Sequence, residues 1–106
     1  MITPERLGAE QSAVSVNLLQ DLRDQIDQID QSWVQLLGRR FALTEKIGEL
    51  KAQHHLSSVD ANREAEQAKQ LRNWASQAEV DADLILHIHR QIVTAVVARH
   101  QEIEGK

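Results

Sequence analysis

An apolar seam between residues 22 and 50 constrains the fold of this chain more than any other feature. Its positions recur at alternating spacings of four and three residues, which is the period of a helical packing surface. Every position carries a large apolar side chain except one, Arg40. The seam consists of Leu22, Ile26, Ile29, Trp33, Leu36, Arg40, Leu43, Ile47 and Leu50. It predicts one long helix over about residues 17 to 53.

Two shorter helices are predicted after the seam, so the expected fold class is all-α with three helices per chain. The segment HHLSSVDAN interrupts the pattern, and its Asp60 suits the N-cap of a second helix that runs to about residue 76. After a second break at SQAEVDAD, spaced Ile and Val residues predict a third helix to about residue 103, with Gly105 at its end. Residues 1–16 have few apolar anchors, so we predict a loose N-terminal arm there and a helical domain over residues 17–106.

The length of the first helix predicts an oligomer. A helix of about 37 residues extends roughly 55 Å, whereas a compact domain of this size has a radius of gyration of about 13 Å. Two shorter helices cannot cover the whole seam, and closed two-fold dimers are the commonest oligomers. We therefore predict an intertwined homodimer, in which a second copy of the long helix covers the first.

Composition excludes several functional classes. The formal net charge of -4 argues against a nonspecific nucleic-acid binder, and the absence of cysteine excludes disulfides and thiolate metal sites. The start of the chain, MITPERLGAEQSAV, lacks the pattern of a signal peptide, and no run of about 18 apolar residues occurs, so we predict a cytoplasmic protein without a membrane partner. His54 and His55 are adjacent and His87 and His89 are two apart, so neither pair predicts a metal site.

Arg40 stands on the seam where a leucine is expected, between Leu36 and Leu43. A guanidinium keeps its charge at neutral pH, and burying it without a partner costs several kcal/mol. It therefore needs a carboxylate of the protein, a bound anion, or a path along which its side chain reaches solvent. These alternatives stay open for Arg40 taken alone.

Lys51 and Arg23 are two further candidate cations. Lys51 follows Arg40 by eleven residues, which returns to within about 20° of the same helical direction, so the two side chains share a face and can bracket a small anion. Taken alone, Lys51 also fits a solvated lysine at a helix end. Arg23 lies roughly 100° away around the axis, so it would serve the same site only from the second copy of an antiparallel dimer.

These cations belong to a pattern that covers about residues 19 to 103. The segments LRDQIDQID, LLGRR, IGELK and VDANRE follow one another at spacings that resemble the all-helical (AroQ-type) chorismate mutases. The resemblance implies a dimer of three-helix chains with two equivalent pockets, each completed by an arginine from the other chain. It implies catalysis without a cofactor.

The resemblance assigns a role to each matching position. It implies that Arg23 is the arginine donated across the interface and Arg40 the arginine within the chain, each binding one substrate carboxylate, and that Lys51 contacts the ether oxygen. Asp60 and Glu64 match positions near the ring hydroxyl, with Glu64 as its acceptor, and Arg63 matches a neighbouring site residue. Without the family, Asp60 would be read as a helix cap, and the other two as surface residues of a first turn.

The third helix departs from the family pattern. Where the family usually has a Ser and, four residues later, a Gln that hydrogen-bonds the ether oxygen, this chain has Val96 and His100. Val96 offers no side-chain hydrogen bond, so that contact is lost or is made by its backbone or by Thr94. His100 can donate from a ring nitrogen, best when protonated, although it also fits a surface histidine; a one-residue shift offers Gln101 instead.

The predicted function is therefore the rearrangement of chorismate to prephenate, in the biosynthesis of phenylalanine and tyrosine. Catalysis would come from Arg40, Lys51 and His100, by orienting the substrate and placing positive charge at the ether oxygen. Isochorismate-pyruvate lyase and 4-amino-4-deoxychorismate mutase are similar in sequence pattern and remain alternatives, as does a noncatalytic helical interaction module. A second shikimate-pathway enzyme is a further candidate partner.

Overall fold

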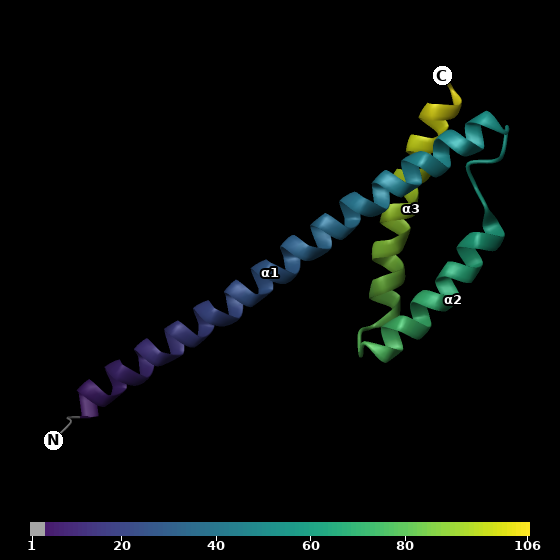
Figure 1. Cartoon of the computed structure of the whole chain (residues 1–106). Helices are drawn as coiled ribbons and strands as arrows, with labels where there is room; N and C mark the ends of the chain where they lie inside the picture. Colours follow the sequence, from purple (N-terminus) through teal and green to yellow (C-terminus); the bar gives the residue numbers. More distant parts are fainter. Residues whose placement is uncertain (1–3) are drawn as a thin grey trace. The chain divides into compact units, whose positions relative to one another are not determined.

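The computed structural model describes residues 4–106, with side chains from residue 12 onward, and this part of the chain is helical apart from its links and C-terminal end. The helices are α1 (Pro4–Gln53), α2 (Ala61–Gln77) and α3 (Ala82–Glu104) (Figure 1). The predicted all-α class with three helices is thus confirmed. The chain forms two compact units, one ending at Arg39 and one spanning Arg40–Lys106, and each is described by itself.

Helix α1 begins at Pro4, so the predicted start near residue 17 was wrong, and residues 4–16 of the expected arm are helical. The physical reason is visible in the sequence. Proline is favoured in the first turn of a helix, where its missing N–H has no partner to lose, and the residues after it are mostly good helix formers. Residues 1–3 of the expected arm lie outside the described residues. The end of α1 at Gln53 agrees with the prediction.

Side chains cap the two shorter helices. The Asp60 carboxylate accepts a hydrogen bond from the backbone N–H of Arg63 at 3.0 Å, which confirms Asp60 as the N-cap of α2. Asp81 caps α3 in the same way, accepting from the backbone N–H of Asp83 at 3.1 Å. Gly105 stands at the C-cap of α3, as predicted.

Helices α1 and α2 both end in a turn with a left-handed residue. His55 has a φ of 55° and Glu79 a φ of 58°. Beyond these residues, the N–H of Leu56 bonds to the carbonyl of Lys51, and the N–H of Val80 to the carbonyl of Ala75. These hydrogen bonds satisfy carbonyl groups that would lack a partner at the end of a helix. The left-handed position itself is usually occupied by glycine. The turns reverse the chain so that α2 and α3 can lie against each other.

Within the second unit, α3 also contacts the last turns of α1. Arg99 on α3 makes a two-pronged contact with Glu45 on α1, its Nη2 donating at 2.6 Å and its Nε at 2.9 Å. The next residue on α3, His100, contacts the backbone carbonyl of Thr44 on α1. These contacts fix α3 beside the part of α1 that carries Arg40 and Lys51.

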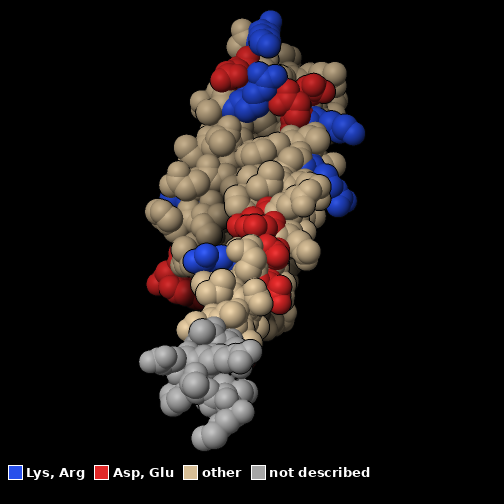
Figure 2. All heavy atoms as spheres, turned by 90° about the vertical axis from the view of Figure 1, so that its left-hand side faces the viewer, with Lys and Arg blue, Asp and Glu red and all other residues tan. Residues whose placement is uncertain are grey.

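The seam side chains of α1 lie open to solvent in a single chain. Ile29 is 65% exposed and Leu43 is 60% exposed, and the other large apolar seam residues are exposed as well. Among residues 12–106 only Gly48, Ala75 and His100 are buried. Figure 2 presents a face on which a broad area carries few charged side chains. No helix within residues 4–106 is both long enough and apolar enough to cross a membrane.

Candidate active site

A cavity of about 330 Å³ lies within the second unit and gathers most of the predicted site residues. Its walls come from α1, the link after it, α2 and α3. The predicted residues that line it are Arg40, Lys51, Asp60, Arg63, Glu64, Val96 and His100. Arg23 is not a lining residue, since it belongs to the first unit.

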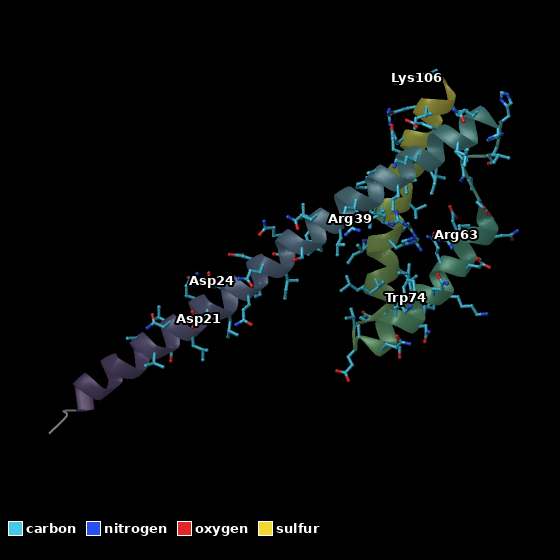
Figure 3. The ribbon with its side chains drawn as sticks, in the orientation of Figure 1. Asp21, Asp24, Arg39, Arg63, Trp74 and Lys106 are labelled. Carbon is cyan, nitrogen blue, oxygen red and sulfur yellow. The ribbon has the colours of Figure 1, made fainter. Side chains whose placement is uncertain are left out.

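Three cations face this cavity. Arg40 and Lys51 are half-buried on α1, as their shared helical face predicts, and Arg63 lies on the first turns of α2 (Figure 3). Within residues 12–106 none of the three forms an ion pair with a carboxylate. Of the alternatives for Arg40, an ion pair is not observed among the described residues, and a bound anion and a path to solvent stay open.

Apolar side chains also line the cavity. Leu43 and Ile47 contribute from α1, the helix that carries Arg40 and Lys51, and Val93, Val96 and Val97 contribute from α3. Val96 presents only methyl groups, as predicted from its residue type. A cavity lined by both cations and methyl groups suits a small ligand with a hydrocarbon ring and carboxylates.

The structure decides between the two sequence registers of α3. Val96 and His100 line the cavity, whereas Thr94 and Gln101 line a separate cavity between α2 and α3. The Thr94 hydroxyl donates to the carbonyl of Arg90 at 2.8 Å, within its own helix. Neither Thr94 nor Gln101 lines the cavity that Arg40 and Lys51 line.

His100 is 95% buried at the cavity wall, and one of its two ring nitrogens is already used in a hydrogen bond. The Nε2 atom lies 2.7 Å from the carbonyl oxygen of Thr44, and because a carbonyl only accepts, Nε2 carries the proton and donates it. Nδ1 is buried and has no hydrogen-bond partner among the described residues. His100 can donate to a ligand from Nδ1 when the ring is protonated, or from Nε2 if this atom leaves Thr44.

Gly48 makes this position of His100 possible, and the sequence reasoning missed it. A Cβ atom built on Gly48 would lie 2.5 Å from Cδ2 and 3.0 Å from Nε2 of the imidazole. The ring therefore rests directly on the α1 backbone. The only signal in the sequence was a glycine inside an otherwise strong helical pattern, which often marks a close approach.

His89 is a second residue that the sequence reasoning missed. It lines the larger cavity between α2 and α3, of about 680 Å³, together with Glu64, which lines both cavities. Partial burial lowers the pKa of His89, the positive charge of Arg40 lowers that pKa further, and Glu64 acts in the opposite direction. His89 is therefore close enough to Arg40 and Glu64 to sense their charges.

Comparison with known proteins adds an independent observation. The profile that describes chorismate mutase type II matches residues 22–101, a segment that includes every predicted site residue from Arg23 to His100. The chain belongs to the chorismate mutase type II family. The family resemblance seen in the sequence is thus confirmed.

Curated relatives of this family member are longer proteins. A T-protein of Haemophilus influenzae is 32% identical over 88 residues, covering 83% of this chain and 23% of the relative, and a T-protein of Enterobacter agglomerans is 35% identical over 72 residues, covering 68% and 19%. The bifunctional chorismate mutase/prephenate dehydratase of Aquifex aeolicus is 29% identical over 89 residues, covering 81% and 25%. The matched part of this chain therefore spans a quarter or less of the length of these relatives.

Proposed function

We propose that this chain is a chorismate mutase, which converts chorismate to prephenate in the cytoplasm as a step in making phenylalanine and tyrosine. The observation that carries the proposal is the cavity that Arg40, Lys51 and Arg63 line together with apolar side chains, while none of the three forms an ion pair among the described residues. Membership of the family supports the same substrate. Chorismate carries two carboxylates on a ring, which this arrangement suits.

The proposed reaction requires few chemical groups from the protein. One carbon–oxygen bond breaks while one carbon–carbon bond forms within the same molecule, so no nucleophile, base or redox group is needed. The guanidinium of Arg40 would bind one carboxylate through two parallel hydrogen bonds. Lys51 would donate to the ether oxygen, where negative charge develops as the bond breaks. Glu64, with Asp60, would accept from the ring hydroxyl.

The geometry shifts the balance between the two proposed donors to the ether oxygen. The ammonium group of Lys51 faces the cavity and has no carboxylate partner within residues 12–106. The Nε2–H of His100 is used by Thr44. We therefore assign the catalytic charge chiefly to Lys51. His100 contributes if its Nε2 leaves the Thr44 carbonyl, or if the protonated ring donates from Nδ1.

We also propose that two copies form the working enzyme. The exposed seam side chains of α1 need a partner, and a second copy would bring Arg23 to the pocket. Charge supports this partner, since Asp21 and Asp24 flank the seam (Figure 3), and the groove between α2 and α3 carries Arg72 and Arg90. No dedicated segment for a second shikimate-pathway enzyme is evident in the sequence.

Because of Val96, two related substrates, isochorismate and 4-amino-4-deoxychorismate, should be tested in the same assay. Val96 lines the cavity and presents methyl groups where the family usually has a serine hydroxyl, so the contacts that distinguish chorismate from isochorismate and 4-amino-4-deoxychorismate can differ here. An isochorismate-pyruvate lyase or a 4-amino-4-deoxychorismate mutase would use the same cations. A noncatalytic helical module would not explain why three cations without ion pairs among the described residues line the cavity.

The test is product identification from three separate incubations of purified protein with chorismate, isochorismate and 4-amino-4-deoxychorismate. We expect prephenate from the first and no salicylate plus pyruvate from the second. Faster turnover of either other substrate would replace the proposed activity. Absence of turnover with all three would contradict an independent enzyme.

Lys51→Ala tests the role of Lys51 in this activity. The control is Lys46→Ala, because Lys46 is an exposed lysine on the same helix. Removing the charge at the ether oxygen should lower kcat by about 100- to 1,000-fold, the usual effect of losing one such donor. Lys46→Ala should retain the rate. Similar rates in the two variants would remove Lys51 from the mechanism.

A further inference from the structure

We propose that Gln67 is a further substrate-binding residue, whose amide N–H donates to the ring hydroxyl oxygen while Glu64 accepts the proton of that hydroxyl. This inference rests on the proposed function and deepens it, because it adds a contact to the same substrate. The sequence pattern assigns no role to Gln67, so the contact comes from the tertiary structure.

Gln67 lies on the face of α2 that lines the active-site cavity. It follows Asp60 by seven residues, Arg63 by four and Glu64 by three, which are spacings of one helical face. All four side chains line that cavity, and Gln67 is half-buried there. Gln67 is not among the residues that line the cavity between α2 and α3. It therefore belongs to the side of α2 that faces the substrate.

The amide of Gln67 is available to a ligand. Of the neutral polar side chains that line the cavity, Thr44 donates to the Phe41 carbonyl at 3.1 Å, and His100 bonds to the Thr44 carbonyl. The Gln67 side chain has no hydrogen bond with any described residue. Ser58 has none either, but it belongs to the link before α2. A half-buried amide without a partner favours a ligand that brings a polar group to it.

The neighbouring Glu64 indicates which polar group fits. Residues three apart on a helix have Cβ atoms about 5–6 Å apart, so the two long side chains can reach one ligand atom. A carboxylate only accepts hydrogen bonds, an amide NH₂ donates them, and a hydroxyl does both. A ring hydroxyl can therefore donate to Glu64 and accept from Gln67 at the same time.

This contact should affect binding rather than the chemical step. The ring hydroxyl takes no part in the bonds that break and form, so its hydrogen bonds are alike in the ground state and the transition state. Loss of such a contact raises KM and leaves kcat unchanged. One hydrogen bond between neutral groups corresponds to about a 3- to 10-fold change in affinity.

The experiment compares KM and kcat for chorismate in the wild type, Gln67→Met and Gln70→Met. Methionine is unbranched and a good helix former like glutamine, but it has no amide. Gln70 is an exposed glutamine on α2 that does not line the cavity, so it is the matched control. We expect a KM about 3- to 10-fold higher in Gln67→Met with kcat preserved, and both constants unchanged in Gln70→Met. Circular dichroism verifies that the variants are folded.

A third variant tests the direction of the hydrogen bond. Gln67→Glu keeps an acceptor at this position but has no N–H to donate. We therefore expect its KM for chorismate to be raised as well. A wild-type KM in Gln67→Glu would overturn the assignment of Gln67 as a donor.

A second measurement separates the hydroxyl contact from a change in the shape of the cavity. The compound 4-deoxychorismate, which lacks the ring hydroxyl, is titrated as a competitor of chorismate. Its inhibition constant should be the same in the wild type and in Gln67→Met. An unchanged KM for chorismate in Gln67→Met, or an equal loss of affinity for both compounds, overturns this inference and leaves the proposed function intact. Absence of chorismate turnover in the wild type overturns both.

Discussion

At the scale of single residues, Gly48 shows how one missing side chain shapes the site. Glycine is a poor helix former, yet it stands in the interior of α1. The imidazole of His100 occupies the space that a Cβ would need, and its Nε2 reaches the Thr44 carbonyl from there. The local cost to the helix is offset by a contact between helices far apart in the sequence.

Gly48→Ala should therefore destabilise the protein, in contrast to Gly38→Ala. At Gly38 a Cβ meets nothing within 4 Å, so alanine should add about 0.5–1 kcal/mol through its better helix propensity. At Gly48 the clash with the His100 ring should outweigh that gain, since overpacking costs about 1–3 kcal/mol. Urea unfolding of both variants measures the difference. A Gly48→Ala protein as stable as Gly38→Ala would refute the close approach.

At the scale of helices, the pairing of α3 with α1 depends on a charged clasp. Arg99 binds both oxygens of Glu45 across the two helices, and its Nη1 also donates to Glu102 at 3.1 Å. The hydrogen bonds from Arg99 lower the pKa of Glu45, and the same contacts raise the pKa of Arg99. The clasp stands next to His100 in sequence, so it helps to place the cavity wall.

This clasp should give the protein an acid-sensitive contribution to stability. A carboxyl group whose pKa is lowered on folding stabilises the fold above its unfolded pKa, and the contribution is lost as the pH falls through the folded value. Glu45→Gln should thus be less stable than the wild type at pH 7, and the gap should close near pH 3. Glu49→Gln, an exposed neighbour on α1, is the control.

Urea midpoints at the two pH values test the clasp. We expect a modest gap, because both partners of the pair are partly exposed to solvent. An equal gap at both pH values would mean that Glu45 contributes through packing rather than charge.

At the scale of the whole molecule, a single chain lacks a core of its own. Only Gly48, Ala75 and His100 are buried among residues 12–106, while the large apolar residues of the α1 seam are exposed. Burial of apolar surface is the main favourable term in folding, so exposed seam residues of this size need a partner. This is the physical basis for the proposed homodimer.

Ile29→Glu should dissociate this dimer, whereas Gln28→Glu, which adds the same charge one residue away from the seam, should not. Burying an unpaired carboxylate costs several kcal/mol, which corresponds to a dimer weakened by about 100-fold or more. Sedimentation of both variants, together with mutase activity at low protein concentration, gives the measurement. If Ile29→Glu sediments like the wild type, the seam is not the dimer interface.

Local patterns in the sequence predicted the helices well. The seam spacing, the Asp60 cap and the chain breaks depend on interactions within a few residues, because a helix is built from bonds between residues four apart. The start of α1 was missed although its signal, Pro4, was present. Arg40, Lys51, Asp60 and Glu64, which the family pattern assigns to the site, line one cavity in the structure.

By itself, then, the sequence determined an all-helical chain with cations on one helical face and a family membership that the comparisons confirm. Only the tertiary structure decided which register of α3 faces the cavity, that Nε2 of His100 bonds to the Thr44 carbonyl, and that Glu64 lines two cavities. These contacts join residues tens of positions apart. Their formation depends on how whole helices pack, which no local periodicity encodes.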